Sequence, residues 1–119
     1  MPHLNQEQID GLISAAGVDQ TREILAAFWR SSEGLLADLN NLLLDDQFEA
    51  AFQAAHALKG AAANVGARTI EERARDIETA CRASQSVSSD ELNILLADFS
   101  ESQAAFARHL DQFETNGAE

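Results

Sequence analysis

The chain has 119 residues, of which 22 are Ala and 14 are Leu, and this composition favours an all-α domain over a β-sandwich or barrel. A formal net charge of −12 argues against a nucleic-acid or anionic-membrane binder, and a single Cys excludes an internal disulfide and a Cys-based zinc site. No 18-residue apolar run or signal peptide is recognisable, so we expect a soluble, cytoplasmic protein with one domain over residues 1–119.

The first predicted element is a short helix over residues 4–16 that ends at Gly17. Asp19 is placed to cap a second helix, in which Ser31 to Gly34 lowers the helix propensity and marks a position for a kink or break. Apolar residues of this helix repeat at alternating spacings of 3 and 4, interrupted by one serine: Leu25, Phe28, Ser32, Leu35, Leu39 and Leu42.

Three further helices follow, each introduced by a capping-box pattern. Asp46 with Glu49 opens a helix over 47–64 that ends at Gly66, and Thr69 with Glu72 opens the next. After a polar loop at 84–89, Ser88 with Glu91 opens the last helix, and residues 115–119 are expected to be a loose tail. The expected apolar faces are Phe48, Ala51, Phe52, Ala55, Leu58 and Ala62, then Ile70, Ala74, Ile77 and Cys81, then Leu92, Leu96, Phe99, Phe106, Leu110 and Phe113.

Four amphipathic helices joined by short polar loops predict an antiparallel up-down four-helix bundle with a short extra N-terminal helix. The common enzyme motifs, such as a phosphate-binding loop or a nucleophile elbow, do not occur in the sequence. A di-iron bundle would need a Glu three residues before each ligating His, but Gln53 precedes His56 and Phe106 precedes His109. We therefore disfavour a metal- or cofactor-binding enzyme, and we expect His3 to be solvated and His109 to be a surface or boundary residue.

His56 lies at the boundary between the apolar face of its helix and solvent. Lys59, the only lysine in the chain, follows one turn later and could meet an anion attached to the imidazole. Gly60 stands in an Ala-rich stretch where Ala would stabilise the helix by roughly 0.5–1 kcal/mol, which suggests that a partner surface needs access there. These three residues suit a histidine that accepts a phosphoryl group, although a boundary histidine beside a chance glycine gives the same pattern.

The segment from His56 to Ala67, HALKGAAANVGA, resembles the motif of the histidine-containing phosphotransfer (HPt) domain family. The motif reads H-x-L-K-G, then two small residues, and later an apolar residue followed by Gly. The order and length of the predicted helices are also similar to this family over the whole chain. Many relatives carry Ser after the motif glycine, whereas this chain has Ala61 and Ala62.

The resemblance implies that His56 is phosphorylated on Nε2, that Lys59 contacts the phosphoryl oxygens and that Gly60 keeps the approach open. Gln53, Ala63 and Arg68 are candidate supporting residues, of which Gln53 has no motif match. The resemblance also implies a phosphocarrier that is not itself a kinase and that binds no cofactor of its own, because the partner receiver domain supplies Mg²⁺.

The expected partners are receiver domains of a hybrid histidine kinase and of a response regulator, between whose aspartates a phosphoryl group is shuttled. We expect a monomer, because the predicted helices have polar, strongly charged faces. The alternative from another functional class is an adaptor that binds a receiver domain without being phosphorylated.

Overall fold

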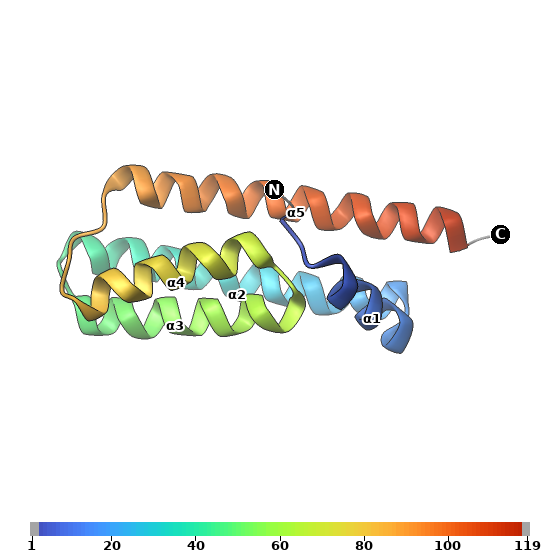
Figure 1. Cartoon of the computed structure of the whole chain (residues 1–119), viewed down its shortest axis with the longest axis horizontal. Helices are drawn as coiled ribbons and strands as arrows, with labels where there is room; N and C mark the ends of the chain where they lie inside the picture. The colour runs from blue at the N-terminus through green and yellow to red at the C-terminus, as the bar shows by residue number, and fades with distance from the viewer. Residues whose placement is uncertain (1–2, 118–119) are drawn as a thin grey trace.

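The computed structural model describes residues 3–117, and the side chains of residues 3–115. It consists of five helices: α1 (Gln6–Ala16), α2 (Val18–Leu44), α3 (Phe48–Val65), α4 (Arg68–Arg82) and α5 (Ser89–Gly117). Helices α2 to α5 run side by side in an elongated bundle, and α1 lies across one end (Figure 1). The predicted all-α bundle with a short extra N-terminal helix is therefore confirmed.

Two glycines with positive φ form the tight connections at one end of the bundle. Gly17, with a φ of 87°, separates α1 from α2, and Gly66, with a φ of 77°, ends α3 in the left-handed conformation. Side chains other than glycine rarely adopt these angles, so both positions stop a helix as predicted.

Three of the four predicted N-cap residues do not cap their helices. Helix α2 already begins at Val18, so Asp19 lies inside its first turn, and α4 begins at Arg68, so Thr69 is also inside its helix. Asp46 has a φ of 53° in the turn before α3 and does not cap it. Only the last predicted cap is confirmed, since the Glu91 backbone N–H donates to the Ser88 hydroxyl over 3.1 Å.

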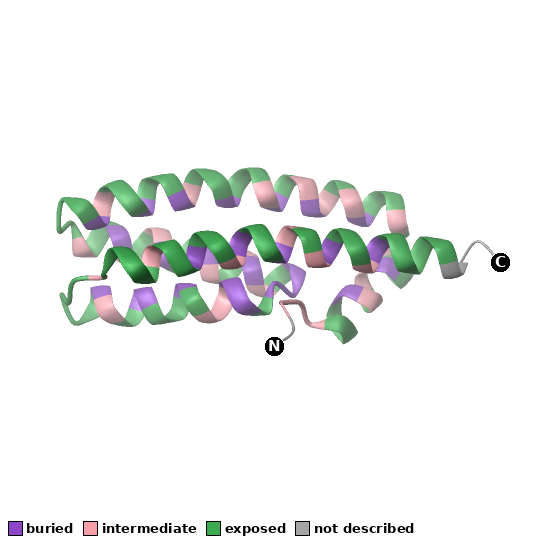
Figure 2. Ribbon diagram, turned by 90° about the horizontal axis from the view of Figure 1, so that it is seen from above, coloured by how far each residue is buried: buried purple, intermediate pink, exposed green. Residues whose placement is uncertain are grey.

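The core fills the space between the helices, with buried residues on their inward faces (Figure 2). All four predicted core positions of α4 are buried. In α2 the buried face after Ser32 passes through Leu36 and Leu43 rather than the predicted Leu35 and Leu42. Helix α2 is continuous through this serine, so the helix does not break at Ser31 to Gly34, where the sequence suggested a kink or break.

In α5 the predicted apolar face is one position off at its start, and its last predicted member, Phe113, is exposed. Leu95 is buried, whereas Leu96 is 53% exposed. Trp29 of α2 packs edge-on against Phe99 and Phe106, so these two residues lie on the inward face of the following turns of α5. Helix α5 continues to Gly117, so the loose tail expected from residue 115 is wrong up to that point, and residues 118–119 lie outside the described residues.

Helix α1 is attached to the C-terminal end of α3. The Asn5 backbone N–H donates to the Gly66 carbonyl over 2.8 Å, and the Gln8 side-chain amide donates to the Ala63 carbonyl over 2.6 Å. These two bonds add a second donor to each carbonyl, since the Ala63 and Gly66 carbonyls also accept from the backbone N–H groups of Gly66 and Arg68. Among residues 3–117, no helix is both long and apolar enough to cross a membrane.

Candidate functional site

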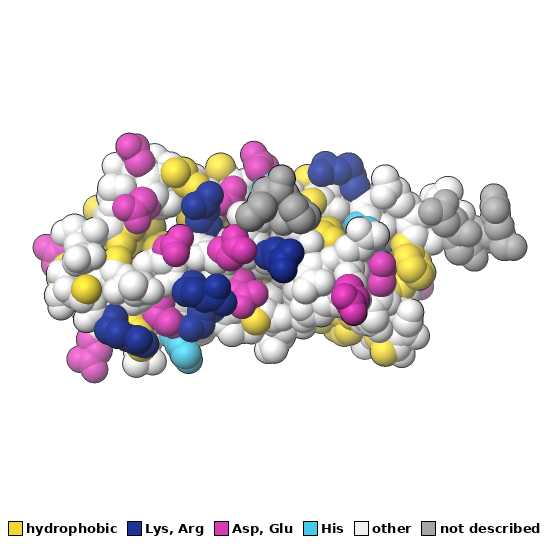
Figure 3. All heavy atoms as spheres, viewed as in Figure 1, with side chains coloured by type: hydrophobic (Ala, Val, Ile, Leu, Met, Phe, Trp, Pro, Cys, Tyr) yellow, Lys and Arg dark blue, Asp and Glu magenta, His cyan; other side chains and the backbone are white. Residues whose placement is uncertain are grey.

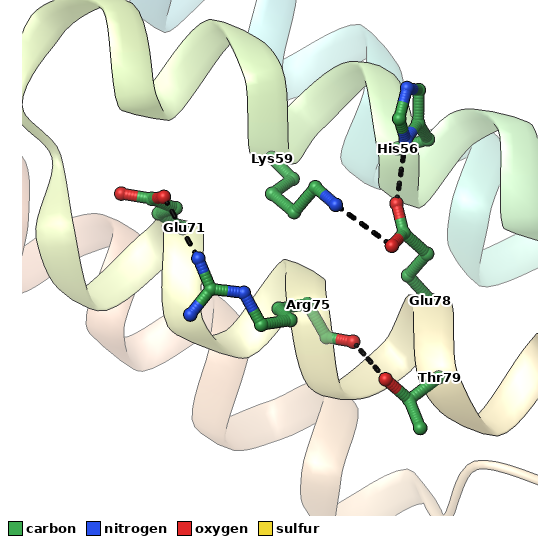
Figure 4. Close-up of polar contacts among 6 residues, drawn as sticks. All are labelled: His56, Lys59, Glu71, Arg75, Glu78 and Thr79. Carbon is green, nitrogen blue, oxygen red and sulfur yellow. Dashed lines mark hydrogen bonds and ion pairs between the residues drawn. The ribbon is translucent and has the colours of Figure 1, made fainter.

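His56 projects from the middle of α3 beside α4, and its side chain is 60% exposed. Helix α3 forms here because the segment is rich in Ala, and the buried Ala55 and Leu58 on either side of His56 in the sequence hold this turn against the core. The histidine is therefore presented on a rigid, well-packed helix. One ring nitrogen faces α4 and the other points away from it (Figure 4).

Glu78 of α4 binds both polar residues that the sequence singled out. Its Oε2 lies 2.7 Å from His56 Nδ1, and its Oε1 lies 2.8 Å from Lys59 Nζ. The Glu78 side chain is only 8% exposed, whereas that of Lys59 is 25% exposed. One buried carboxylate thus connects the imidazole to the ammonium group across the α3–α4 interface (Figure 4).

The pKa of Glu78 is lowered from its ordinary value, mainly by the hydrogen bond from Lys59 and then by the one from His56, against the opposing effect of burial. Glu78 is therefore ionised at neutral pH. An ionised carboxylate only accepts hydrogen bonds, so Nδ1 of His56 must carry the proton that it donates. In the neutral ring, the lone pair is then on Nε2, which faces solvent.

Gly60 lies one turn after His56 and is exposed. A Cβ atom added at Gly60 would have no neighbouring atom within 4 Å, so the glycine is not required by packing within this chain. The access role of Gly60 stays a prediction. Gln53 is exposed on the preceding turn, and the Ala63 carbonyl is used by Gln8, as described above.

The structure does not bring the predicted supporting residue Arg68 to the imidazole. Arg68 is the first residue of α4, ten positions before Glu78, which corresponds to about 15 Å along the helix axis. Arg73 faces α5, where it donates to Asp98 over 2.7 Å. Among the described residues, no hydrogen bond joins either arginine to His56, so the supporting role of Arg68 stays a prediction that the geometry does not favour.

Basic side chains nevertheless gather on the face that α3 and α4 form, next to a histidine, and alternate there with acidic ones (Figure 3). On the surface of α4, Arg75 pairs with Glu71 over 3.1 Å.

The other two histidines connect the N-terminal segment to α5. His109 Nε2 lies 2.6 Å from the Asp10 carboxylate, and His3 contacts Thr69 and Glu101 at 3.1 and 3.2 Å. The expectation that His3 is solvated is wrong, since its side chain is 22% exposed. His109 is a boundary residue, as expected.

His3 also approaches two carboxylates, Asp98 and Glu101, closely enough for the three to hold a metal ion. Asp98 already binds Arg73 there, and a guanidinium beside a ligand opposes the binding of a cation. We therefore assign no metal to this cluster.

Comparison with known proteins bears on the family and the fold. The sequence matches the family model of the Hpt domain over residues 23–115. A search of curated proteins finds no match. The fold is similar to the crystal structure of histidine-containing phosphotransfer protein B (HptB) from Pseudomonas aeruginosa PAO1, with a TM-score of 0.83 and 20% sequence identity over 93% of this chain and 96% of that one. Since the family match covers most of the chain, this protein belongs to the Hpt domain family.

Proposed function

We propose that this protein is a phosphocarrier. It accepts a phosphoryl group from one receiver domain on Nε2 of His56 and passes it on to another receiver domain. The observation that carries the proposal is the contact between His56 Nδ1 and the ionised Glu78 at 2.7 Å. This hydrogen bond leaves the exposed Nε2 with a lone pair, which is what a nucleophile needs.

The transfer requires one bond to form and one to break. The Nε2 lone pair attacks the phosphorus of an aspartyl phosphate on the receiver, the N–P bond forms, and the P–O bond to the aspartate breaks, so that the carboxylate leaves with the bonding electrons. The imidazole ring gains positive charge in this step. Glu78 stabilises that charge through Nδ1–H, because a hydrogen bond strengthens when its donor becomes charged.

Lys59 supplies the second charge at the site. Its ammonium group donates to Glu78, and two of its three protons remain for other acceptors. A phosphoryl group on Nε2 would bring negative charge close to Glu78, and Lys59 offsets the repulsion between the two. We therefore infer that Lys59 acts on the phosphorylated form both through Glu78 and by contact with phosphoryl oxygens.

The chemistry of the partner follows from what this site lacks. Among the described residues, none of the groups around His56 forms a metal-binding cluster, and no phosphate-binding loop occurs in the sequence. We propose that the receiver domain supplies Mg²⁺ and the phosphorylated aspartate, and that the protein shuttles phosphoryl groups between receivers of a hybrid kinase and of a response regulator in the cytoplasm.

The test is to mix the protein with a receiver domain carrying radiolabelled aspartyl phosphate. The wild-type protein should take up acid-labile, base-stable label, and His56→Gln should abolish the uptake. His3→Gln and His109→Gln are matched controls that should keep it. Uptake by His56→Gln would contradict the proposal, and a protein that binds the receiver without becoming labelled would be an adaptor.

A further inference from the structure

Phe52 stacks on His56 one helical turn before it. The two ring planes are only 11° apart, with their centroids separated by 6.0 Å. Phe52 is half-buried against the core, whereas His56 is mostly exposed. The more buried ring therefore lies alongside the more exposed one.

Arg82 extends the stack from the neighbouring helix. The central guanidinium carbon of Arg82 lies 5.2 Å from the centroid of Phe52, within the range of a cation–π interaction. Arg82 is the last residue of α4, so it reaches Phe52 across the same helix interface at which Glu78 reaches His56. Arg82 and Glu78 of α4 thus contact two successive turns of α3, at Phe52 and His56.

The hydrogen bond to Glu78 and the stack on Phe52 restrain the imidazole in different directions. A single hydrogen bond at Nδ1 restrains the ring at one atom, but coupled rotations about the Cα–Cβ and Cβ–Cγ bonds of His56 can still tilt the ring while that contact is kept. A parallel ring alongside opposes this rotation, because tilting the imidazole would break the stacking contact. Together the two contacts define both the direction of Nε2 and the plane in which its lone pair lies.

We propose that Phe52 is a positioning residue for phosphoryl transfer, which holds the His56 ring plane while Arg82 holds Phe52 in place. This inference rests on the proposed function of His56. In-line attack on phosphorus depends on the direction of the attacking lone pair, so a ring that rotates freely is correctly oriented for a smaller fraction of the time. Phe52 itself does not touch the phosphoryl group.

The test compares Phe52→Leu, which keeps an apolar side chain but removes the ring, with Phe52→Tyr, which keeps the ring. Transfer from a phosphorylated receiver should be about fivefold slower in Phe52→Leu, equivalent to about 1 kcal/mol in the barrier, and near wild type in Phe52→Tyr. Phe113→Leu is a matched control, because Phe113 is exposed near the C-terminal end of α5. Arg82→Gln should slow transfer without removing any core side chain. Its control is Arg108→Gln, which changes an exposed arginine of α5 and should leave transfer unchanged.

A second readout separates positioning from a merely structural role. NMR relaxation of the His56 ring in the unphosphorylated protein should give a lower order parameter in Phe52→Leu and a restored one in Phe52→Tyr. An unchanged order parameter, or an unchanged transfer rate in Phe52→Leu, would overturn the positioning role. A wild-type protein that takes up no label would overturn the proposed function instead, so the two failures are distinguishable.

Discussion

The clearest perturbation of the site is Glu78→Gln, because Glu78 holds both His56 and Lys59. The amide oxygen of Gln can accept a hydrogen bond from only one of the two donors, and its NH₂ group then faces the other donor. One hydrogen bond to a charged group is lost, which is worth roughly 1.5–3 kcal/mol. We expect the low end of this range, since the His56 side chain is 60% exposed.

The same change should slow phosphoryl transfer at least tenfold, because a loss of about 1.4 kcal/mol from the transition state corresponds to a factor of ten in rate. The assay follows the loss of label from a phosphorylated receiver by rapid quench. Glu71→Gln is a matched control on the same helix, where Glu71 pairs with Arg75 at the surface and away from the imidazole. The reasoning is refuted if Glu78→Gln transfers at the wild-type rate and still carries its His56 proton on Nδ1 by ¹⁵N NMR.

Three further predictions follow from the same site. Gly60→Gln should melt no lower than wild type, since an added Cβ atom meets nothing within 4 Å there, yet transfer should be at least tenfold slower. Gly34→Gln, where an added Cβ is equally unobstructed, is the control, and normal transfer by Gly60→Gln would remove the access role. Lys59→Ala should shorten the lifetime of the phosphorylated form, measured by release of phosphate, with unaltered helical circular dichroism; an unchanged lifetime and transfer rate would leave Lys59 without a role. Wild type should have a higher free energy of unfolding in urea than Glu78→Gln at neutral pH. This difference should shrink as the pH falls through the lowered pKa of Glu78. A constant difference down to pH 3 would contradict the ionised carboxylate.

Much of the fold could be predicted from the sequence because helix periodicity and glycine stops are local signals. Gly17 and Gly66 ended helices where expected, and the core stripe of α4 was correct throughout. The faces of α2 and α5 were each partly wrong by one position. Their Leu-rich segments contain neighbouring apolar residues, such as Leu35 and Leu36 or Leu95 and Leu96, and only packing against other helices decides which of the two is buried.

The caps were less predictable than the helices. Asp46 and Thr69 have the residue types of an N-cap, but the turns before α3 and α4 are short and their geometry is set by the packing of the two helices. Ser88 follows a longer polar loop, where its side chain is free to reach the first turn of α5.

At the site, the sequence pointed to His56, Lys59 and Gly60 but not to Glu78, which contacts two of them. The motif is continuous on one helix, whereas Glu78 comes from another helix and carries no motif of its own. Its one visible signal is its position beside Ile77 on the apolar face of α4, where a carboxylate would be costly to bury without a partner. Pairing it with His56 required the register of α3 against α4.

The most direct measurement of the central claim is a ¹⁵N–³¹P NMR experiment on protein labelled with ¹⁵N-histidine and mixed with a phosphorylated receiver. The account predicts one phosphorus coupled to Nε2 of His56, while Nδ1 keeps its proton. Phosphorus coupled to Nδ1, phosphorus on His3 or His109, or no phosphohistidine at all would contradict it.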